Sequence, residues 1–143
     1  MNKFFKNFIL ILLSFLFLFN SVLSQEEKIK IGLLVPVTGD NKEIGNQIIK
    51  STRLALKDIN FKNLEIHLKD TGSNPNKTMK SALELKDMGI NIVIGPIFHK
   101  SLKYLDEIED LIFLSLTNKT IDLPNNVIST GVNATSQLNA IKK

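Results

Sequence analysis

The chain has 143 residues, of which 43% are apolar and 22% charged, the composition of one globular domain rather than of a disordered or fibrous chain. It contains no cysteine, which excludes disulfides, thiolate metal sites, a cysteine nucleophile and lipid attachment at a cysteine. Residues 1–24 hold two of the 18 basic residues and none of the 14 acidic ones, so the net charge of +4 falls to +2 beyond them. Because that remainder has no basic run, nucleic acid is not an expected partner.

The first segment has the three parts of a secretory signal peptide. Two lysines precede an apolar run over residues 8–19, and small residues follow up to Ser24. The run is short for a membrane span, which needs roughly 20 residues. We therefore predict a signal peptide over residues 1–24, cleaved after Ser24, and a periplasmic protein. The alternative is an uncleaved N-terminal anchor, and only then would the protein be attached to a membrane.

Two strand–helix units follow in the sequence. Residues 28–37 form a nearly continuous apolar run, which predicts a strand covered on both faces of a parallel sheet. After a turn at residues 38–41, apolar residues recur at helical spacing from Ile44 to Ile59. Residues 64–70 alternate between apolar and polar, which predicts a half-exposed edge strand with His67 on its solvated face.

The second helix has clear start and stop signals. Asn74 is a good N-cap, and Gly89 suits the end of the helix. Met79, Ala82 and Leu83 are expected to form its buried face.

The remaining chain alternates strands and helices again. Residues 90–95, 111–116 and 125–130 are short runs typical of interior parallel strands, and short helices are expected around residues 102–108 and from 134 onward. This alternation predicts an α/β fold: an open parallel sheet of about five strands with helices on both faces. The edge character of the second strand favours the strand order 2-1-3-4-5.

Ligands of such sheets bind beyond the carboxyl ends of the strands, near the point where the strand order reverses. Three loops meet there, at residues 36–41, 95–101 and 115–120. Ser101 also lies at an expected helix start, a place suited to an anion or carboxylate. The candidate ligand-binding residues are Thr38, Phe98, His99, Ser101, Thr117 and Asn118.

Enzyme signatures are missing from the sequence. The seven glycines never form GxGxxG or GxxxxGK[ST], and there is no GxSxG motif. His99 has no nearby carboxylate in the sequence to orient it, and helix capping accounts for Asp40 and Asp70. We therefore predict a protein that is not an enzyme and has no cofactor or metal. A small flavodoxin-like enzyme that uses His99 is the alternative from another functional class.

Several stretches resemble the amino-terminal lobe of type I periplasmic binding proteins, the leucine/isoleucine/valine-binding group. They are "KIGLLVPVTGDNKEIGNQIIKSTRLALKDIN", "LKDTGSNPNKTMKSALELKDMGINIVIGPIF" and "LIFLSLTN". The Asp-Thr-Gly at 70–72 and Gly-Pro-Ile-Phe at 95–98 are similar to the penicillin-binding protein activator branch. In amino-acid-binding members, the loops after the third and fourth strands contact ligand, and at the matching positions Ser101 and Thr117 carry a hydroxyl here.

The resemblance implies an exported, non-catalytic binding module for a small polar ligand or a protein partner. The alternative within the family is the solute-binding component of a branched-chain amino-acid ABC transporter. Residues 25–143 match one lobe, apparently truncated before the second. We expect the face that would meet a second lobe to favour self-association or a protein partner, with Phe98 as its apolar anchor.

We expect the chain recovered from the periplasm of a bacterial host to begin at Gln25. Mass spectrometry of the intact chain measures this N-terminus. Residues 1–24 retained on a membrane-bound chain would support the anchor instead, and a chain confined to the cytoplasm would contradict export.

Overall fold

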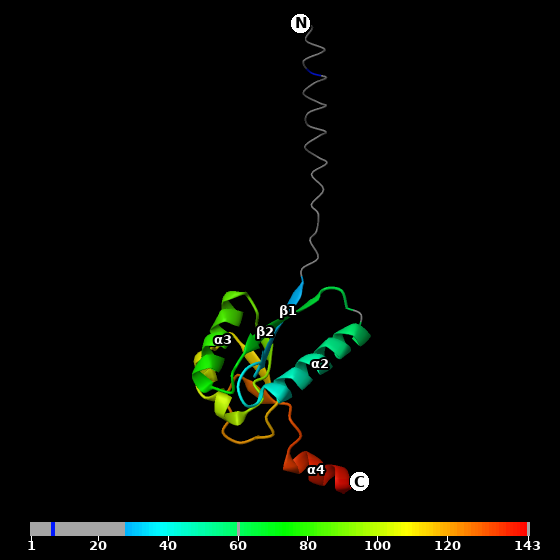
Figure 1. Ribbon diagram of the computed structural model, residues 1–143, viewed down its shortest axis with the longest axis vertical. Coiled ribbons are helices and arrows are strands. Elements are labelled where there is room, and N and C mark those ends of the chain that lie inside the picture. Colours follow the sequence, from blue (N-terminus) through cyan, green and yellow to red (C-terminus); the bar gives the residue numbers. More distant parts are fainter. Residues whose placement is uncertain (1–6, 8–27, 60, 143) are drawn as a thin grey trace.

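The computed structural model describes residues 7, 28–59 and 61–142 (Figure 1). The signal peptide predicted over residues 1–24 and its cleavage site lie outside the described residues, apart from Asn7. The first half of the domain contains β1 (Ile29–Val35), α2 (Lys42–Ile59), β2 (Leu64–Asp70) and α3 (Pro75–Asp87). The second half contains β3 (Ile92–Ile94), the 3-10 turns η1 (His99–Leu102) and η2 (Leu105–Glu107), β4 (Ile112–Ser115), β5 (Val127–Ser129) and α4 (Ala134–Ile141).

The five strands form one parallel sheet in the order β2-β1-β3-β4-β5, which confirms the predicted fold class and places β2 at an edge. Ile31 is in register with Ile66 on one side and with Ile92 on the other. Because residues in register on parallel strands point to the same side, the sheet has two distinct faces. Figure 1 shows α3 beside one of them and α2 beside the other, and we call them the α3 face and the α2 face.

The hydrophobic core lies on the α3 face. Gly32 in β1 leaves room for α3, because a Cβ there would lie 2.7 Å from Leu85 Cδ1. Strands β1, β3, β4 and β5 each contribute one apolar side chain to this core. Helix α3 and the segment between β3 and β4 cover these four side chains. The core residues are Leu34, Val93, Phe113 and Val127 from the strands, with Ala82, Leu85, Ile90, Leu102, Leu105, Ile108 and Leu111.

The α2 face is covered over β1 but open over β3 to β5. Helix α2 approaches the end of β1 so closely at Gly45 that a Cβ would lie 1.8 Å from the Pro36 carbonyl oxygen. Leu33 and Val35 are buried on this face. Ile92, however, is 41% exposed although β3 lies inside the sheet. The prediction that this strand is interior to the sheet is confirmed, but no described helix covers Ile92 on the α2 side.

The edge strand β2 also reverses one expectation. His67 is in register with Gly32 and so lies on the α3 face, where its side chain is only 17% exposed. Its Nε2 lies 3.3 Å from Glu65 Oε1 but without the geometry of a hydrogen bond. The prediction of a solvated His67 is wrong because α3 packs beside β2, with Lys69 paired to Glu84. Leu68, on the opposite face, is the exposed member of the strand.

Helix α3 begins as predicted, but its buried face is rotated. The Asn74 side chain accepts a hydrogen bond from the Lys77 amide at 3.0 Å, which confirms the N-cap. Leu83 is exposed, whereas the small residues Thr78 and Ser81 are buried beside Ala82 and Leu85. Small polar residues fit there because their hydroxyls donate hydrogen bonds to backbone carbonyls. Ser81 Oγ, for example, donates to the backbone carbonyl oxygen of Asp70 at 3.1 Å. Helix α2 keeps its expected row in the middle, where Ile48, Thr52 and Leu56 are partly buried, but Ile44 and Ile59 at the two ends are exposed.

Helix α4 lies away from the sheet (Figure 1). None of its residues is buried. Among the described residues, no helix has the length and apolar character needed to cross a bilayer.

Adjacent residues of β3 provide a test of the two faces. Val93→Asp should abolish cooperative unfolding, because it places an unpaired charge in the core on the α3 face. Ile92→Asp should leave a folded protein, because Ile92 is partly exposed on the α2 face. Thermal unfolding followed by circular dichroism measures both. Equal destabilisation by the two substitutions would contradict the open α2 face.

Candidate functional site

Loops from three strands meet at the carboxyl edge of the sheet: the β1 loop (residues 36–41), the β3 loop (residues 95–101) and the β4 loop (residues 115–120). The last residue of β2, Asp70, holds the β1 loop in place. Its Oδ1 accepts hydrogen bonds from the backbone amides of Val37 at 2.7 Å and Thr38 at 3.2 Å. The same oxygen accepts a third bond, from the Gly72 amide at 2.8 Å. One carboxylate thus joins the loops that follow β1 and β2.

The other oxygen of Asp70 binds two side chains. Oδ2 accepts a hydrogen bond from Thr38 Oγ1 at 2.6 Å and forms an ion pair with Lys77 of α3. Partial burial alone would raise the pKa of Asp70. The hydrogen bonds from Lys77, from Thr38 and from the backbone outweigh burial and hold this pKa well below its ordinary value. The sequence-based assignment of Asp70 to helix capping is therefore wrong, since Asn74 caps α3.

The β3 and β4 loops are joined through Pro96. Gly95 has a φ of +103°, and a Cβ there would lie 2.1 Å from the Leu34 carbonyl oxygen, so the position requires glycine. The peptide bond between Gly95 and Pro96 is cis. Ser115 Oγ, at the end of β4, donates a buried hydrogen bond to the Pro96 oxygen at 2.8 Å. This bond sets the spacing of the two loops.

The β4 loop is joined in turn to the chain beyond β5. The Thr117 carbonyl accepts hydrogen bonds from Ser129 Oγ at 2.7 Å and from the Gly131 amide at 3.1 Å. Thr117 itself is buried, and its Oγ1 accepts a bond from the Lys119 amide at 3.3 Å. The edge is therefore a connected set of loops rather than separate segments.

The side chains of Lys119 and His99 lie next to each other at this edge. Lys119 Nζ of the β4 loop lies 2.9 Å from His99 Nε2, which follows β3. Because an ammonium group has no acceptor, Lys119 donates and the imidazole nitrogen accepts. The carboxylate of Asp122 is 3.9 Å from the same Nζ and is highly exposed. Lys119 keeps two further N–H donors, which could bind an anionic group placed between the loops.

The structure places the predicted site residues in three environments. Thr38, His99 and Asn118 are exposed at the edge, and Phe98 is half-buried. Ser101 and Thr117 are buried, and the Ser101 hydroxyl has no hydrogen-bond partner among the described residues. The fold brings His99 of the β3 loop next to the β4 loop, while Thr38 is turned toward Asp70 and Lys77. The binding roles of these six residues stay predictions.

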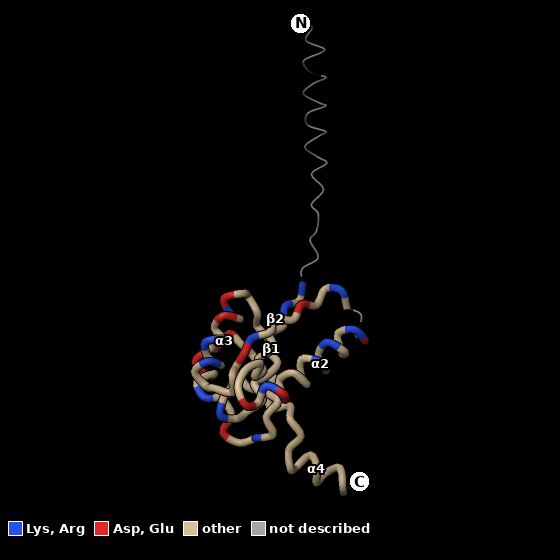
Figure 2. The backbone as a smooth tube through the Cα atoms, in the orientation of Figure 1, with Lys and Arg blue, Asp and Glu red and all other residues tan. Residues whose placement is uncertain are grey.

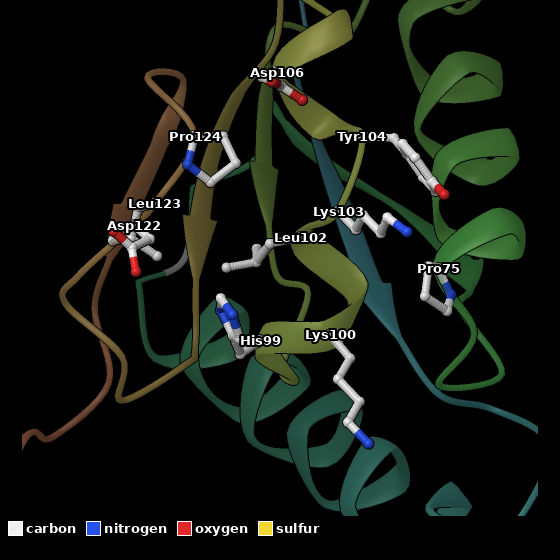
Figure 3. A pocket seen from close by; sticks show the side chains of 10 residues that line it. All are labelled: Pro75, His99, Lys100, Leu102, Lys103, Tyr104, Asp106, Asp122, Leu123 and Pro124. Carbon is white, nitrogen blue, oxygen red and sulfur yellow. The ribbon is translucent and has the colours of Figure 1, made fainter.

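A cavity of about 680 Å³ lies beside this edge (Figure 3). Figure 3 shows Leu102 of η1 in the middle of this cavity, with Lys103 and Tyr104 on one side and residues 122–124 on the other. His99 lies below Leu102 in this view. The lining residues are Pro75, His99, Lys100, Leu102, Lys103, Tyr104, Asp106, Asp122, Leu123 and Pro124. Over residues 28–59 and 61–142, no three His, Asp or Glu side chains are grouped to hold a metal ion.

Sequence reasoning missed two contributors to the edge, Lys77 and Lys119. Lys77 lies in the first turn of α3. It pairs with Asp70 only because the loop between β2 and α3 brings the start of the helix back beside that carboxylate. Lys119 was within the predicted loop, but nothing in the sequence pairs it with His99, which is 20 residues away. Its place in a loop after an interior strand was the one available signal.

The chain is similar to known proteins in its sequence pattern and in its fold. A family model described as periplasmic binding protein matches residues 28–142. No curated protein matches the chain at a significant level.

Similar solved structures include three from different bacteria. The leucine binding protein LivK from Thermotoga maritima matches with a TM-score of 0.59 and 18% identity over 64% of this chain and 28% of its own. The C-domain of LpoA from Haemophilus influenzae, a regulator of PBP1A, matches with a TM-score of 0.59 and 23% identity over 72% of this chain and 32% of its own. A solute binding protein of an ABC transporter from Rhodopseudomonas palustris, in complex with 3,4-dihydroxybenzoic acid, matches with a TM-score of 0.60 and 25% identity over 64% of this chain and 28% of its own. The chain thus spans about a third or less of each of these proteins.

Substituting Asp70 should lower stability in a pH-dependent way. The folded-state pKa lies below the unfolded one, so ionised Asp70 stabilises the fold above about pH 4, and this contribution is lost as pH falls below that. Asp70→Asn should therefore cost on the order of 1–3 kcal/mol near neutral pH and make stability less sensitive to acid. Urea unfolding over a pH series measures both effects.

Asp40→Asn is the matched control. Asp40 is exposed in the β1 loop and has no hydrogen bond or ion pair to any described residue. This variant should unfold like the parent chain at every pH. An equal loss in the two variants would mean that the Asp70 hydrogen bonds do not stabilise the edge.

Proposed function

Because the chain belongs to the periplasmic binding protein family, we propose that it is an exported, non-catalytic binding module that holds a small carboxylate-bearing ligand at the carboxyl edge of its sheet. The observation that carries this proposal is the pair formed by His99 and Lys119. Their nitrogens lie 2.9 Å apart on loops from two neighbouring strands, with both side chains accessible. After donating to His99, the ammonium group of Lys119 keeps two N–H donors and its positive charge, which suits it to the oxygens of one carboxylate.

The surroundings of the pair support an anionic ligand. The nearest carboxylate, Asp122, is 3.9 Å from Lys119 and exposed, so it offers weak competition in water. Asp70 is directed to the β1 loop and Lys77, where its charge is already compensated. The half-buried Phe98 beside His99 supplies an apolar surface for the rest of the ligand.

The names of similar proteins are consistent with this ligand class. One is called a leucine binding protein and another is in complex with 3,4-dihydroxybenzoic acid. Both ligands carry a carboxyl group, and the second also carries an aromatic ring that could stack on Phe98.

Binding by this edge should be weak. The candidate residues come from loops at one side of one sheet, so a small ligand would be contacted from that side and stay open to water on the other. Binding proteins that enclose a ligand bury most of its surface. We infer that this chain by itself binds a small carboxylate-bearing ligand with a dissociation constant near the millimolar range.

A protein partner at the same edge is the second candidate. The observation in its favour is coverage: the full-length LpoA structure matches 76% of this chain, against 64% for LivK. An extended partner would also gain contacts beyond the His99 and Lys119 pair. The role of solute-binding component in a branched-chain amino-acid transporter requires tighter amino-acid binding than this edge supports.

Titration calorimetry with leucine, isoleucine, valine and 3,4-dihydroxybenzoate tests the proposal. We expect dissociation constants no tighter than about 1 mM, or roughly 4 kcal/mol, for the three amino acids. Lys119→Ala should weaken binding of any ligand that does bind by about three- to tenfold, the effect of losing one charge-assisted hydrogen bond.

Lys57→Ala is the matched control, because Lys57 is exposed in the last turn of α2, away from the carboxyl edge. Its binding constants should equal those of the parent chain. A micromolar constant for an amino acid would contradict the open edge and support the transporter role. No carboxylate binding up to about 20 mM would contradict the ligand class and leave the protein partner.

A further inference from the structure

The excess positive charge of the domain is concentrated in one segment, residues 50–62. This segment contains four basic residues and one acidic residue, Asp58. The rest of residues 28–142 has eleven basic and eleven acidic residues, so its formal charge is zero. Figure 2 shows the positive charges of the segment along the second half of α2 and the turn that follows it. The four basic residues, which we call the basic surface, are Lys50, Arg53, Lys57 and Lys62.

Three of these cations lie on the outer side of α2. Lys50, Arg53 and Lys57 are spaced by three and four residues, so they share one side of the helix. All three are exposed, and none forms an ion pair with a described residue. The side of α2 that faces the sheet carries the partly buried Ile48 and Thr52, each two residues away from Lys50. The cations therefore point away from the sheet, and their charge is available to an anionic surface.

Two exposed apolar side chains lie among the cations. Leu54 comes four residues after Lys50 and three before Lys57, so it lies on the same side of α2, and it is 64% exposed. Phe61 follows the end of α2 directly before Lys62 and is 50% exposed. Apolar side chains exposed between positive charges are typical of helices that lie in the surface of a membrane. There the long basic side chains reach the lipid headgroups while the apolar ones enter the bilayer.

The chain enters the domain next to the basic surface. The Ile29 amide donates a hydrogen bond at 2.7 Å to the carbonyl of Asn63, the residue after Lys62. The apolar run of residues 8–19 is separated from Ile29 only by residues 20–28. Such a connection spans at most about 35 Å when fully extended. While that run is held in a membrane, the basic surface is therefore kept close to lipid headgroups.

From these observations we propose that the basic surface docks the domain on a membrane that contains anionic phospholipids. The cations bind the headgroup phosphates, and Leu54 and Phe61 enter the interfacial layer. An anionic bilayer is the occupant that fits both features, because its surface offers many negative charges and its acyl boundary accepts apolar side chains. The proposal does not depend on the ligand, since none of the candidate ligand-binding residues belongs to this surface.

Co-sedimentation with lipid vesicles tests the docking, using the chain purified after export. We expect vesicles with about one third phosphatidylglycerol to bind the chain roughly tenfold more tightly than vesicles of phosphatidylcholine alone, and high salt to release it. A chain carrying both Arg53→Ala and Lys57→Ala should bind the anionic vesicles roughly tenfold more weakly. The matched control carries Lys80→Ala and Lys142→Ala, which remove the same charge from exposed sites on α3 and at the end of α4. It should bind like the parent chain.

The absence of native tryptophan allows a direct test of insertion. The fluorescence emission of Phe61→Trp should shift to shorter wavelength when anionic vesicles are added, because the indole ring leaves water. Leu83→Trp is the control, since Leu83 is 42% exposed on α3, and its emission should stay unchanged. Circular dichroism on heating checks that every variant is folded. If residues 1–24 are retained and anchor the chain, the same emission is compared in reconstituted vesicles with and without phosphatidylglycerol.

Three results would overturn the proposal. One is a chain that binds anionic vesicles no better than neutral ones. The second is an equal loss of binding in the two double variants, which would indicate that net charge matters and not the basic surface. The third is an unchanged emission of Phe61→Trp on vesicles that do bind, which would indicate a contact by charge alone, open to any polyanion.

Discussion

The domain depends on one dry interface, the contact of the sheet with α3 and the segment between β3 and β4. Gly32 lets Leu85 reach the sheet, and Val93 and Phe113 lie beside it with no exposure. Because the strands from β3 to β5 are only three or four residues long, this side supplies nearly all of their apolar burial. The α3 face therefore holds the strands in register, whereas Ile92, Ile112 and Ile128 on the opposite face are exposed among the described residues.

The carboxyl edge adds an electrostatic constraint to this core. The carboxylate of Asp70 accepts five hydrogen bonds, which join the β1 loop, the turn before α3 and Lys77. At the other strands the same task falls to hydroxyl groups, such as Ser115 bonding to Pro96. Loops held in this way bring His99 Nε2 and Lys119 Nζ to 2.9 Å from each other.

The family match identifies the fold of the domain, whereas the ligand depends on the side chains of the loops. The match over residues 28–142 establishes a periplasmic binding protein domain, and the fold is similar to that of the solved relatives. The ligand is decided by side chains at the loops, which vary independently of the fold. Here the edge presents a histidine, a lysine and a half-buried phenylalanine, a combination that favours an anionic ligand with an apolar body.

The sequence by itself determined the five strands, their order and the helices α2, α3 and α4, but the short helix expected around residues 102–108 is two 3-10 turns, η1 and η2. The alternation over residues 64–70 placed β2 at the edge, and Asn74 marked the start of α3, because these signals act within a few residues. Only the tertiary structure decided which face of each strand is covered: Ile92 and Val93 are equally apolar, yet one is exposed and the other buried. It also decided the partners of Asp70 and the approach of His99 to Lys119. Alternation along a strand defines two faces but not the element that covers each, and contacts between distant residues exist only once the loops have been folded against one another.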